Sequence, residues 1–244
     1  MSTALTRVAP EERLGSGAMF DGIAPRYDLL NLLASFGLDR RWRRALVRAL
    51  RPVDPAAPAL LVDVATGTAD VALALGRAYP AARVVGVDPS PVMLLHGARK
   101  LVRGGLSGRS LLLRGDGQRL PLPDGVADGV SIAFGIRNVP DRAACAREMA
   151  RVARPGAPLA VLELGEPRAG PLRFLARLHV HAVVPALGAF LSGSREYRYL
   201  ARSIAAFPPP PAFARLLGEE GGWREVQVQR MAFDAAHLYL GRAP

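Results

Sequence analysis

Short apolar runs alternate with helix-like segments through the middle of the chain. Strands of a parallel sheet appear as continuous apolar runs, because helices cover both faces of such a sheet. Alternation of such runs with helical segments is typical of βαβ units. The pattern predicts five parallel strands, at residues 59–65, 83–88, 110–114, 129–134 and 158–163. It predicts helices from about Asp70 to Tyr79, from Ser90 onward and from about Asp141 to Arg154.

The C-terminal tail has a different pattern. Residues 225–231 alternate with period two, and residues 236–240 form another short apolar segment. Two strands this close in sequence pair most simply as an antiparallel hairpin at the sheet edge. The predicted fold class is therefore α/β, with a Rossmann-like, mostly parallel sheet of seven strands, a C-terminal antiparallel hairpin and helical additions.

Two segments outside the sheet account for the helical additions. Residues 38–50 form an amphipathic pattern, with Trp42, Leu46 and Leu50 on one face and arginines opposite. Residues 168–213 are expected to be helical or irregular and to cover the substrate. We expect one domain over residues 1–244, with an N-terminal helical element at 1–50 and the insertion at 168–213.

Composition narrows the class of protein. Half of the residues are hydrophobic and 22% are charged, which is typical of a globular domain. The formal net charge is +11, and Lys100 is the only lysine. High-GC codon usage and attraction to an anionic surface both remain open as explanations. Nucleic acid is not an expected partner, because the arginines are dispersed and no aromatic-interleaved basic stripe is present.

Several classes of site and location are excluded. The single cysteine, Cys145, rules out an internal disulfide and a cysteine-rich zinc site, and we expect it in the core. Neither a metal-spaced Asp/Glu/His cluster nor a secretory signal is present. The longest apolar run, residues 178–191, is shorter than the roughly 20 residues that a bilayer requires. The expectation is a cytoplasmic protein, at most peripheral to the inner face of the membrane.

The candidate cofactor residues fall at the carboxyl ends of successive strands, where open parallel sheets bind ligands. Gly67 lies in the first strand-to-helix turn, where the lack of a side chain admits a ligand close to the backbone. Asp88 ends the second strand, where it can accept hydrogen bonds from ribose hydroxyls. Asp116 follows the third strand and can bind an adenine amino group or position Gly117. Asp63, within the first strand, is expected to brace the turn.

Two alternatives to a methyl-transfer site compete here. An ordinary tight turn at Gly67 with a solvated Asp88 remains open. A nicotinamide-dependent dehydrogenase is disfavoured, because the turn lacks a full G-x-G-x-x-G motif and the hairpin departs from the all-parallel dinucleotide fold. These patterns favour a methyltransferase.

From Met19 to Gly241 the chain resembles the ubiquinone/menaquinone-biosynthesis C-methyltransferases. The most specific stretch is Phe134-Gly-Ile-Arg-Asn-Val139, and residues 20–31, 35–43 and 197–204 also match. The resemblance implies C-methylation of a polyprenyl quinol with S-adenosylmethionine as cofactor. It also implies cofactor contacts at Thr68, Asp88, Asp116 and Gly117. The chain departs from the family at several positions, among which Ala69 replaces a usual glycine and Ala133 a frequent serine.

Methyl transfer to carbon requires an electron-rich ring carbon aligned with the sulfonium methyl group in a pocket that excludes water. Arg137 is expected to stabilise the developing phenolate, directly or through a water that Asn138 holds. Tyr27 is expected to bind the substrate oxygen or to cover the methionine moiety. A capping and salt-bridging role for Arg137 and Asn138, and a core position for Tyr27, are the structural alternatives.

The acceptor is less closely defined. Demethylmenaquinol is favoured, while the ubiquinone-precursor benzoquinol and another small phenolic or polyketide acceptor stay open. A catalytically inactive binding protein is the non-enzymatic alternative. The apolar run at 178–191 would line a long isoprenoid tail, with basic helix faces resting on anionic lipid. A homodimer also stays open.

Overall fold

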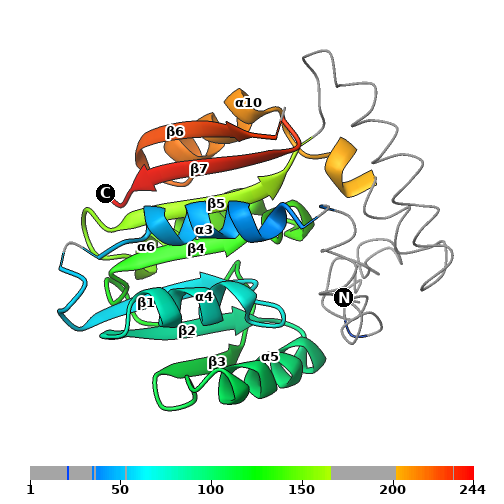
Figure 1. Cartoon of the computed structure of the whole chain (residues 1–244). Helices are drawn as coiled ribbons and strands as arrows, with labels where there is room; N and C mark the ends of the chain where they lie inside the picture. The colour runs from blue at the N-terminus through cyan, green and yellow to red at the C-terminus, as the bar shows by residue number, and fades with distance from the viewer. Residues whose placement is uncertain (1–20, 22–34, 36, 53, 166–201, 233) are drawn as a thin grey trace, which may run out of the picture.

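The structure is a computed structural model that describes residues 21, 35, 37–52, 54–165, 202–232 and 234–244. Seven strands form one sheet in the order β3-β2-β1-β4-β5-β7-β6 (Figure 1). The first five pair in parallel, and β7 lies antiparallel between β5 and β6. The α/β prediction, with its edge hairpin, is confirmed. The strands are β1 (Ala59–Val64), β2 (Ala82–Asp88), β3 (Ser110–Arg114), β4 (Gly129–Ala133), β5 (Pro158–Leu164), β6 (Arg224–Met231) and β7 (Ala236–Arg242).

Helices cover both faces of the sheet, which is why its central strands are apolar on both sides. On β1, Leu61 packs into one core and its neighbour Val62 into the other, and both are fully buried. The first core is closed by α3 (Asp39–Ala49), α4 (Asp70–Ala78) and α5 (Pro91–Arg103), in front of the sheet in Figure 1. The second core is closed by α6 (Arg142–Val152), α10 (Pro210–Arg215) and the short helix η5 (Leu216–Glu220).

Side-chain caps fix two of the predicted helix starts. The Ser90 hydroxyl accepts a hydrogen bond of 3.0 Å from the Met93 backbone N–H, and Pro91 occupies the first helical position. The Asp141 carboxylate accepts one of 2.8 Å from the Ala144 N–H. The cap at Ser90 begins α5 two residues after the end of β2 at Asp88, whereas residues 134–141 separate β4 from α6.

The amphipathic pattern of α3 is confirmed with one correction. Trp42, Leu46 and Leu50 are buried, and the arginines at 40, 41, 44 and 48 are exposed. Arg43 does not lie on the exposed face, because its side chain is only 14% exposed and pairs with an aspartate of α4. On a helix, residue 43 lies 100° from Trp42, at the border between the two faces.

Some sequence predictions concern residues outside the described ranges. Most of the insertion at 168–213 and of the N-terminal element at 1–50 belongs to them, and so does Tyr27. Within the described ranges no helix has the length and hydropathy needed to cross a membrane. Across the same ranges no group of three or more His, Cys, Asp or Glu residues is placed to hold a metal.

Cys145 lies in the second core, as the sequence predicts. Its side chain is fully buried against Met149, and burial raises the pKa of the thiol to about 12. A thiol with so high a pKa is almost wholly protonated near neutral pH, so Cys145 is a packing residue rather than a nucleophile.

Candidate functional site

The strand order reverses between β1 and β4, and the chain bends sharply where β1 ends. Gly67 has a φ of +54°, and the alanines on either side, Ala65 and Ala69, have φ values of +50° and +62°. Left-handed backbone costs a residue with a side chain roughly 1–2 kcal/mol, so the surrounding structure must hold this turn in place. Strain of this kind is concentrated at ligand sites.

Asp88, at the end of β2, holds the turn. One carboxylate oxygen accepts a hydrogen bond of 2.8 Å from the Gly67 N–H, and the other accepts one of 2.9 Å from the Ser90 N–H. Burial raises the pKa of Asp88, while these two hydrogen bonds act to lower it. Each carboxylate oxygen can accept more than one hydrogen bond, so Asp88 can still bind a ligand hydroxyl.

A cavity of about 350 Å³ lies at this edge of the sheet. Five of the predicted site residues line it together with Met93 and Phe134, namely Gly67, Asp88, Asp116, Gly117 and Asn138. A cavity of this volume is within the range of small-molecule and cofactor sites. The residues that the sequence placed at successive strand ends therefore meet around one cavity.

Beyond β3, the Asp116–Gly117 turn forms part of the wall. The Asp116 carboxylate accepts a hydrogen bond of 2.9 Å from the backbone N–H of Gln118. A Cβ atom on Gly117 would lie 3.1 Å from Val64 Cγ1 and 3.2 Å from Cys145 Sγ. Glycine therefore lets this turn pack closely while its backbone faces the cavity.

A second, smaller hollow of about 20 Å³ lies on the other side of the Gly67 turn. It shares Gly67 and Phe134 with the large cavity, and Thr68 and Arg43 lie in its wall. The Thr68 hydroxyl accepts a hydrogen bond of 3.0 Å from Lys100 Nζ. Thr68 is thus part of the site, but it borders the small hollow rather than the large cavity.

Asp63 braces the turn from within β1, in the way that the sequence indicates. It accepts hydrogen bonds of 2.7 Å from the Thr66 hydroxyl and 2.8 Å from the Ser131 hydroxyl. Burial raises the pKa of Asp63 to about 6, although both hydroxyls and the charge of Arg43 act to lower it.

Arg137 does not line either hollow. It lies in the short helix η3 (Ile136–Asn138), and its side chain forms a 2.7 Å ion pair with Glu163 of β5. Its backbone N–H also donates to Glu163, at 3.1 Å, and the guanidinium donates to the Phe134 carbonyl oxygen. Glu163 is fully buried, so the described contacts of Arg137 are those of a buried structural pair. Its catalytic role stays a prediction.

The two alanines that depart from the family, Ala69 and Ala133, differ in their position relative to the two hollows. Ala69 is fully buried and lines neither hollow. Its methyl group faces α5, where a Cβ atom on Gly97 would come within 3.0 Å of it. Ala133 lines both hollows, so the missing serine hydroxyl falls at the site itself.

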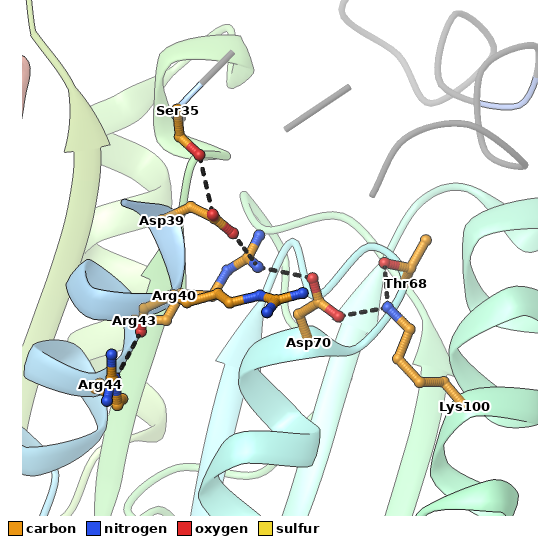
Figure 2. Close-up of polar contacts among 8 residues, drawn as sticks. All are labelled: Ser35, Asp39, Arg40, Arg43, Arg44, Thr68, Asp70 and Lys100. Atoms are coloured by element: carbon orange, nitrogen blue, oxygen red, sulfur yellow. Dashed lines mark hydrogen bonds and ion pairs between the residues drawn. The ribbon is translucent and has the colours of Figure 1, made fainter. Parts of the chain in front are cut away.

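Sequence reasoning missed a chain of polar contacts beside Thr68, which Figure 2 shows. Asp70, the first residue of α4, pairs with Lys100 of α5 and, at 2.7 Å, with Arg43 of α3. Asp39 accepts a 2.8 Å bond from the same Arg43. The family-like stretch at 35–43 was a signal for this region, but residue patterns do not show that α3 reaches the Gly67 turn.

Comparison with known proteins agrees with the site. The ubiE/COQ5 methyltransferase family matches residues 7–242. The chain is 44% identical to the ubiquinone/menaquinone biosynthesis C-methyltransferase UbiE of Syntrophotalea carbinolica, over 91% of this chain and 92% of the relative. It is 43% identical to the demethylmenaquinone methyltransferase of Thermus thermophilus, over 93% of this chain and all of the relative.

Solved structures show the same fold. A SAM-dependent methyltransferase from Aquifex aeolicus superimposes with a TM-score of 0.57 at 17% identity, covering 83% of this chain and 89% of its own. A putative S-adenosyl-L-methionine-dependent methyltransferase from Methanococcus maripaludis gives a TM-score of 0.61 at 15% identity, covering 88% and 90%. The chain belongs to the ubiE/COQ5 methyltransferase family and uses S-adenosylmethionine as its methyl donor.

Proposed function

We propose that this protein transfers the methyl group of S-adenosylmethionine to a ring carbon of a polyprenyl quinol, with demethylmenaquinol as the acceptor. The observation that carries the proposal is the full-length match to the Thermus thermophilus relative, which is named a demethylmenaquinone methyltransferase. The name of the Syntrophotalea carbinolica relative includes ubiquinone as well, so the benzoquinol is the second acceptor to test.

The residues around the large cavity fit the cofactor. Asp88 offers a buried acceptor for ribose hydroxyls, and Gly67 and Gly117 line the same cavity. When bound, the cofactor supplies an electrophilic methyl group on a sulfonium. The remaining task of the protein is to hold the acceptor ring beside that methyl group and to exclude water.

Asn138 is the residue that we assign to the acceptor. It lines the same cavity as Asp88, and its amide can donate a hydrogen bond to a quinol oxygen. Negative charge on that oxygen makes the neighbouring ring carbon nucleophilic, and a hydrogen bond stabilises the charge as it develops. The ring carbon gains the methyl group as the methyl–sulfur bond breaks, and it later loses its proton to water, which restores aromaticity.

Arg137 and Tyr27 have different proposed roles, one in positioning Asn138 and the other in contacting the substrate. Through its ion pair with Glu163, Arg137 fixes the turn that carries Asn138, so we assign it a positioning role. Stabilisation of the phenolate by Arg137 is left out of the proposal, because its side chain lines neither hollow. Tyr27 remains our candidate for contact with the substrate oxygen.

The isoprenoid tail of the acceptor suggests contact with a membrane surface. The exposed arginines of α3, at 40, 41, 44 and 48, form a basic face that would rest on anionic headgroups. Co-sedimentation with anionic vesicles at low salt, and none with neutral vesicles, is the expected result. No binding to anionic vesicles would rule this contact out. Homodimerisation stays a prediction.

The proposed reaction is tested by transfer of labelled methyl from S-adenosylmethionine to three acceptors. These are a short-tailed demethylmenaquinol, a benzoquinol with the same tail and a soluble phenol. We expect label on a ring carbon of the naphthoquinol. We also expect turnover of the Asn138→Ala variant to fall about 100-fold, the loss typical of one removed donor to a developing oxyanion.

Asp88→Ala serves as the control for the cofactor, because it should lose binding of S-adenosylhomocysteine, whereas Asn138→Ala should retain it. Label on the soluble phenol alone would overturn the acceptor assignment. If wild-type protein binds S-adenosylhomocysteine but labels neither quinol, the proposed reaction is wrong.

A further inference from the structure

Arg43 lies beside the Gly67 turn, in the wall of the small hollow. The small hollow there is lined by Arg43, Asp63, Thr68 and Phe134 among others. In the ranges that the structure describes, Arg43 is the only cationic residue of that lining. A cofactor whose ribose lies at Asp88 must extend its amino-acid end in one direction from the turn, and this hollow is the adjoining space.

Only some of the hydrogen-bond donors of the Arg43 guanidinium have partners among the described residues. Its Nη1 atom donates to both carboxylates, at 2.8 Å to Asp39 and 2.7 Å to Asp70 (Figure 2). Its Nε atom is buried and has no hydrogen-bond partner among the described residues. A buried donor without a partner is destabilising, so the structure keeps this one at a cost.

The geometry of the guanidinium group shows which Arg43 donors are available to a ligand. When Nη1 is used by two aspartates, the Nε and Nη2 donors remain together along one edge. Two parallel N–H donors along an edge match the two oxygens of a carboxylate, which binds such a fork bidentately. The Phe134 ring, 5.6 Å from the guanidinium carbon, limits where that edge can turn.

The charges around Arg43 suit a zwitterion. Asp39 and Asp70 balance Arg43 and Lys100 in the chain of contacts, and the carboxyl of Asp63 lies in the wall of the same hollow. The guanidinium of Arg43 and the carboxyl of Asp63, both in the wall of the small hollow, complement the carboxylate and ammonium groups of an amino acid.

We propose that Arg43 binds the carboxylate at the amino-acid end of S-adenosylmethionine through its Nε–Nη2 edge. Asp39 and Asp70 act as positioning residues, since they occupy Nη1 and leave the Nε–Nη2 edge without a partner among the described residues. The proposal concerns the cofactor, so it does not depend on which quinol accepts the methyl group.

The test compares two ligands that differ only at the carboxylate. Calorimetric titration of wild-type protein measures the Kd of S-adenosylmethionine and of decarboxylated S-adenosylmethionine. A charge-assisted hydrogen bond is worth about 1.5–3 kcal/mol, so wild type should prefer the carboxylated ligand by about 10- to 100-fold. In Arg43→Gln the preference should fall to within about 3-fold, while Arg43→Lys should keep an intermediate preference because it retains charge but lacks the fork.

Two controls separate ligand binding from damage to the fold. Arg44→Gln removes the same charge from an exposed position of α3 and should keep the wild-type preference. 5′-Methylthioadenosine lacks the amino-acid end, so Arg43→Gln should bind it as wild type does.

Retention of the wild-type preference by Arg43→Gln would overturn the proposal. So would an equal loss of affinity for both ligands and for 5′-methylthioadenosine, because that result indicates a structural role. If the ligand preferences are as expected but the protein methylates no quinol, the proposed acceptor is wrong. The proposed role of Arg43 in cofactor binding is then still supported.

Discussion

Two largely buried arginines near the Gly67 turn and the end of β4 illustrate how differently one residue type can be used. Arg137 has a fully buried partner, Glu163, that binds both its backbone N–H and its guanidinium. Arg43 shares one nitrogen between the buried Asp39 and the partly exposed Asp70, and its other edge is unoccupied by the described residues. Arg137 lines neither hollow, whereas Arg43 lines the smaller one. The partners of an arginine, more than its place in a motif, decide what it can bind.

The comparison predicts that Arg137 contributes most to stability. Arg137→Met should lower the free energy of unfolding by about 3–5 kcal/mol, because it leaves the Glu163 charge buried without its partner. Urea denaturation measures this loss. The double variant Arg137→Met/Glu163→Gln should regain part of it, since no charge is then left behind. A single variant as stable as wild type would show that the pair is not structural.

Asp63 gives a pH-dependent test of the region around Arg43. Its pKa is about 6 in the folded protein and 3.8 unfolded, so the folded state binds more protons between these values. One pKa unit corresponds to about 1.36 kcal/mol, so the contribution of Asp63 to the free energy of unfolding falls by about 3 kcal/mol as the pH rises from about 4 to 6. Above about pH 6 this contribution no longer changes with pH.

Asp63→Asn should remove this component from the pH dependence of urea denaturation. Arg43→Gln should extend it to higher pH, because the charge of Arg43 holds the pKa of Asp63 down. If the profile of Arg43→Gln matches wild type, the two groups are not coupled.

Arg43→Gln itself should cost little stability. Its pair with the partly exposed Asp70 contributes about 0–1 kcal/mol, and the buried Asp39 keeps a hydrogen bond from the Ser35 hydroxyl when Arg43 is replaced. We expect a loss of about 1 kcal/mol by urea denaturation, with Arg44→Gln as the neutral reference. If Arg43→Gln loses as much unfolding free energy as Arg137→Met, Arg43 is as important to stability as Arg137 and the comparison is wrong.

The smallest expected effect lies at Ala69, the residue before Asp70. Ala69→Gly relieves a left-handed alanine but removes a buried methyl group worth about 0.8 kcal/mol. The net gain in unfolding free energy should be a few tenths to about 1 kcal/mol. Ala72→Gly, in right-handed α4, is the matched control and should destabilise. A loss at Ala69 would mean that methyl packing outweighs the strain.

The strands and the cavity residues at their ends were predictable because they depend on local pattern and on the topology of parallel sheets. Asp88 ends one strand and Gly117 comes shortly after the next, so their meeting at one edge required no knowledge of tertiary contacts. The partners of Arg137 and Arg43 were not predictable in this way. Glu163 is 26 residues from Arg137, and Asp70 is 27 from Arg43, so only the packing of separate elements brings each pair together.

A crystal structure with S-adenosylhomocysteine tests the central claim most directly. The account predicts the ribose hydroxyls within hydrogen-bond distance of Asp88, the adenine against the Asp116–Gly117 turn and the carboxylate on Arg43. Ligand bound with its ribose away from Asp88, or outside the cavity at the carboxyl ends of β1, β2 and β4, would contradict it.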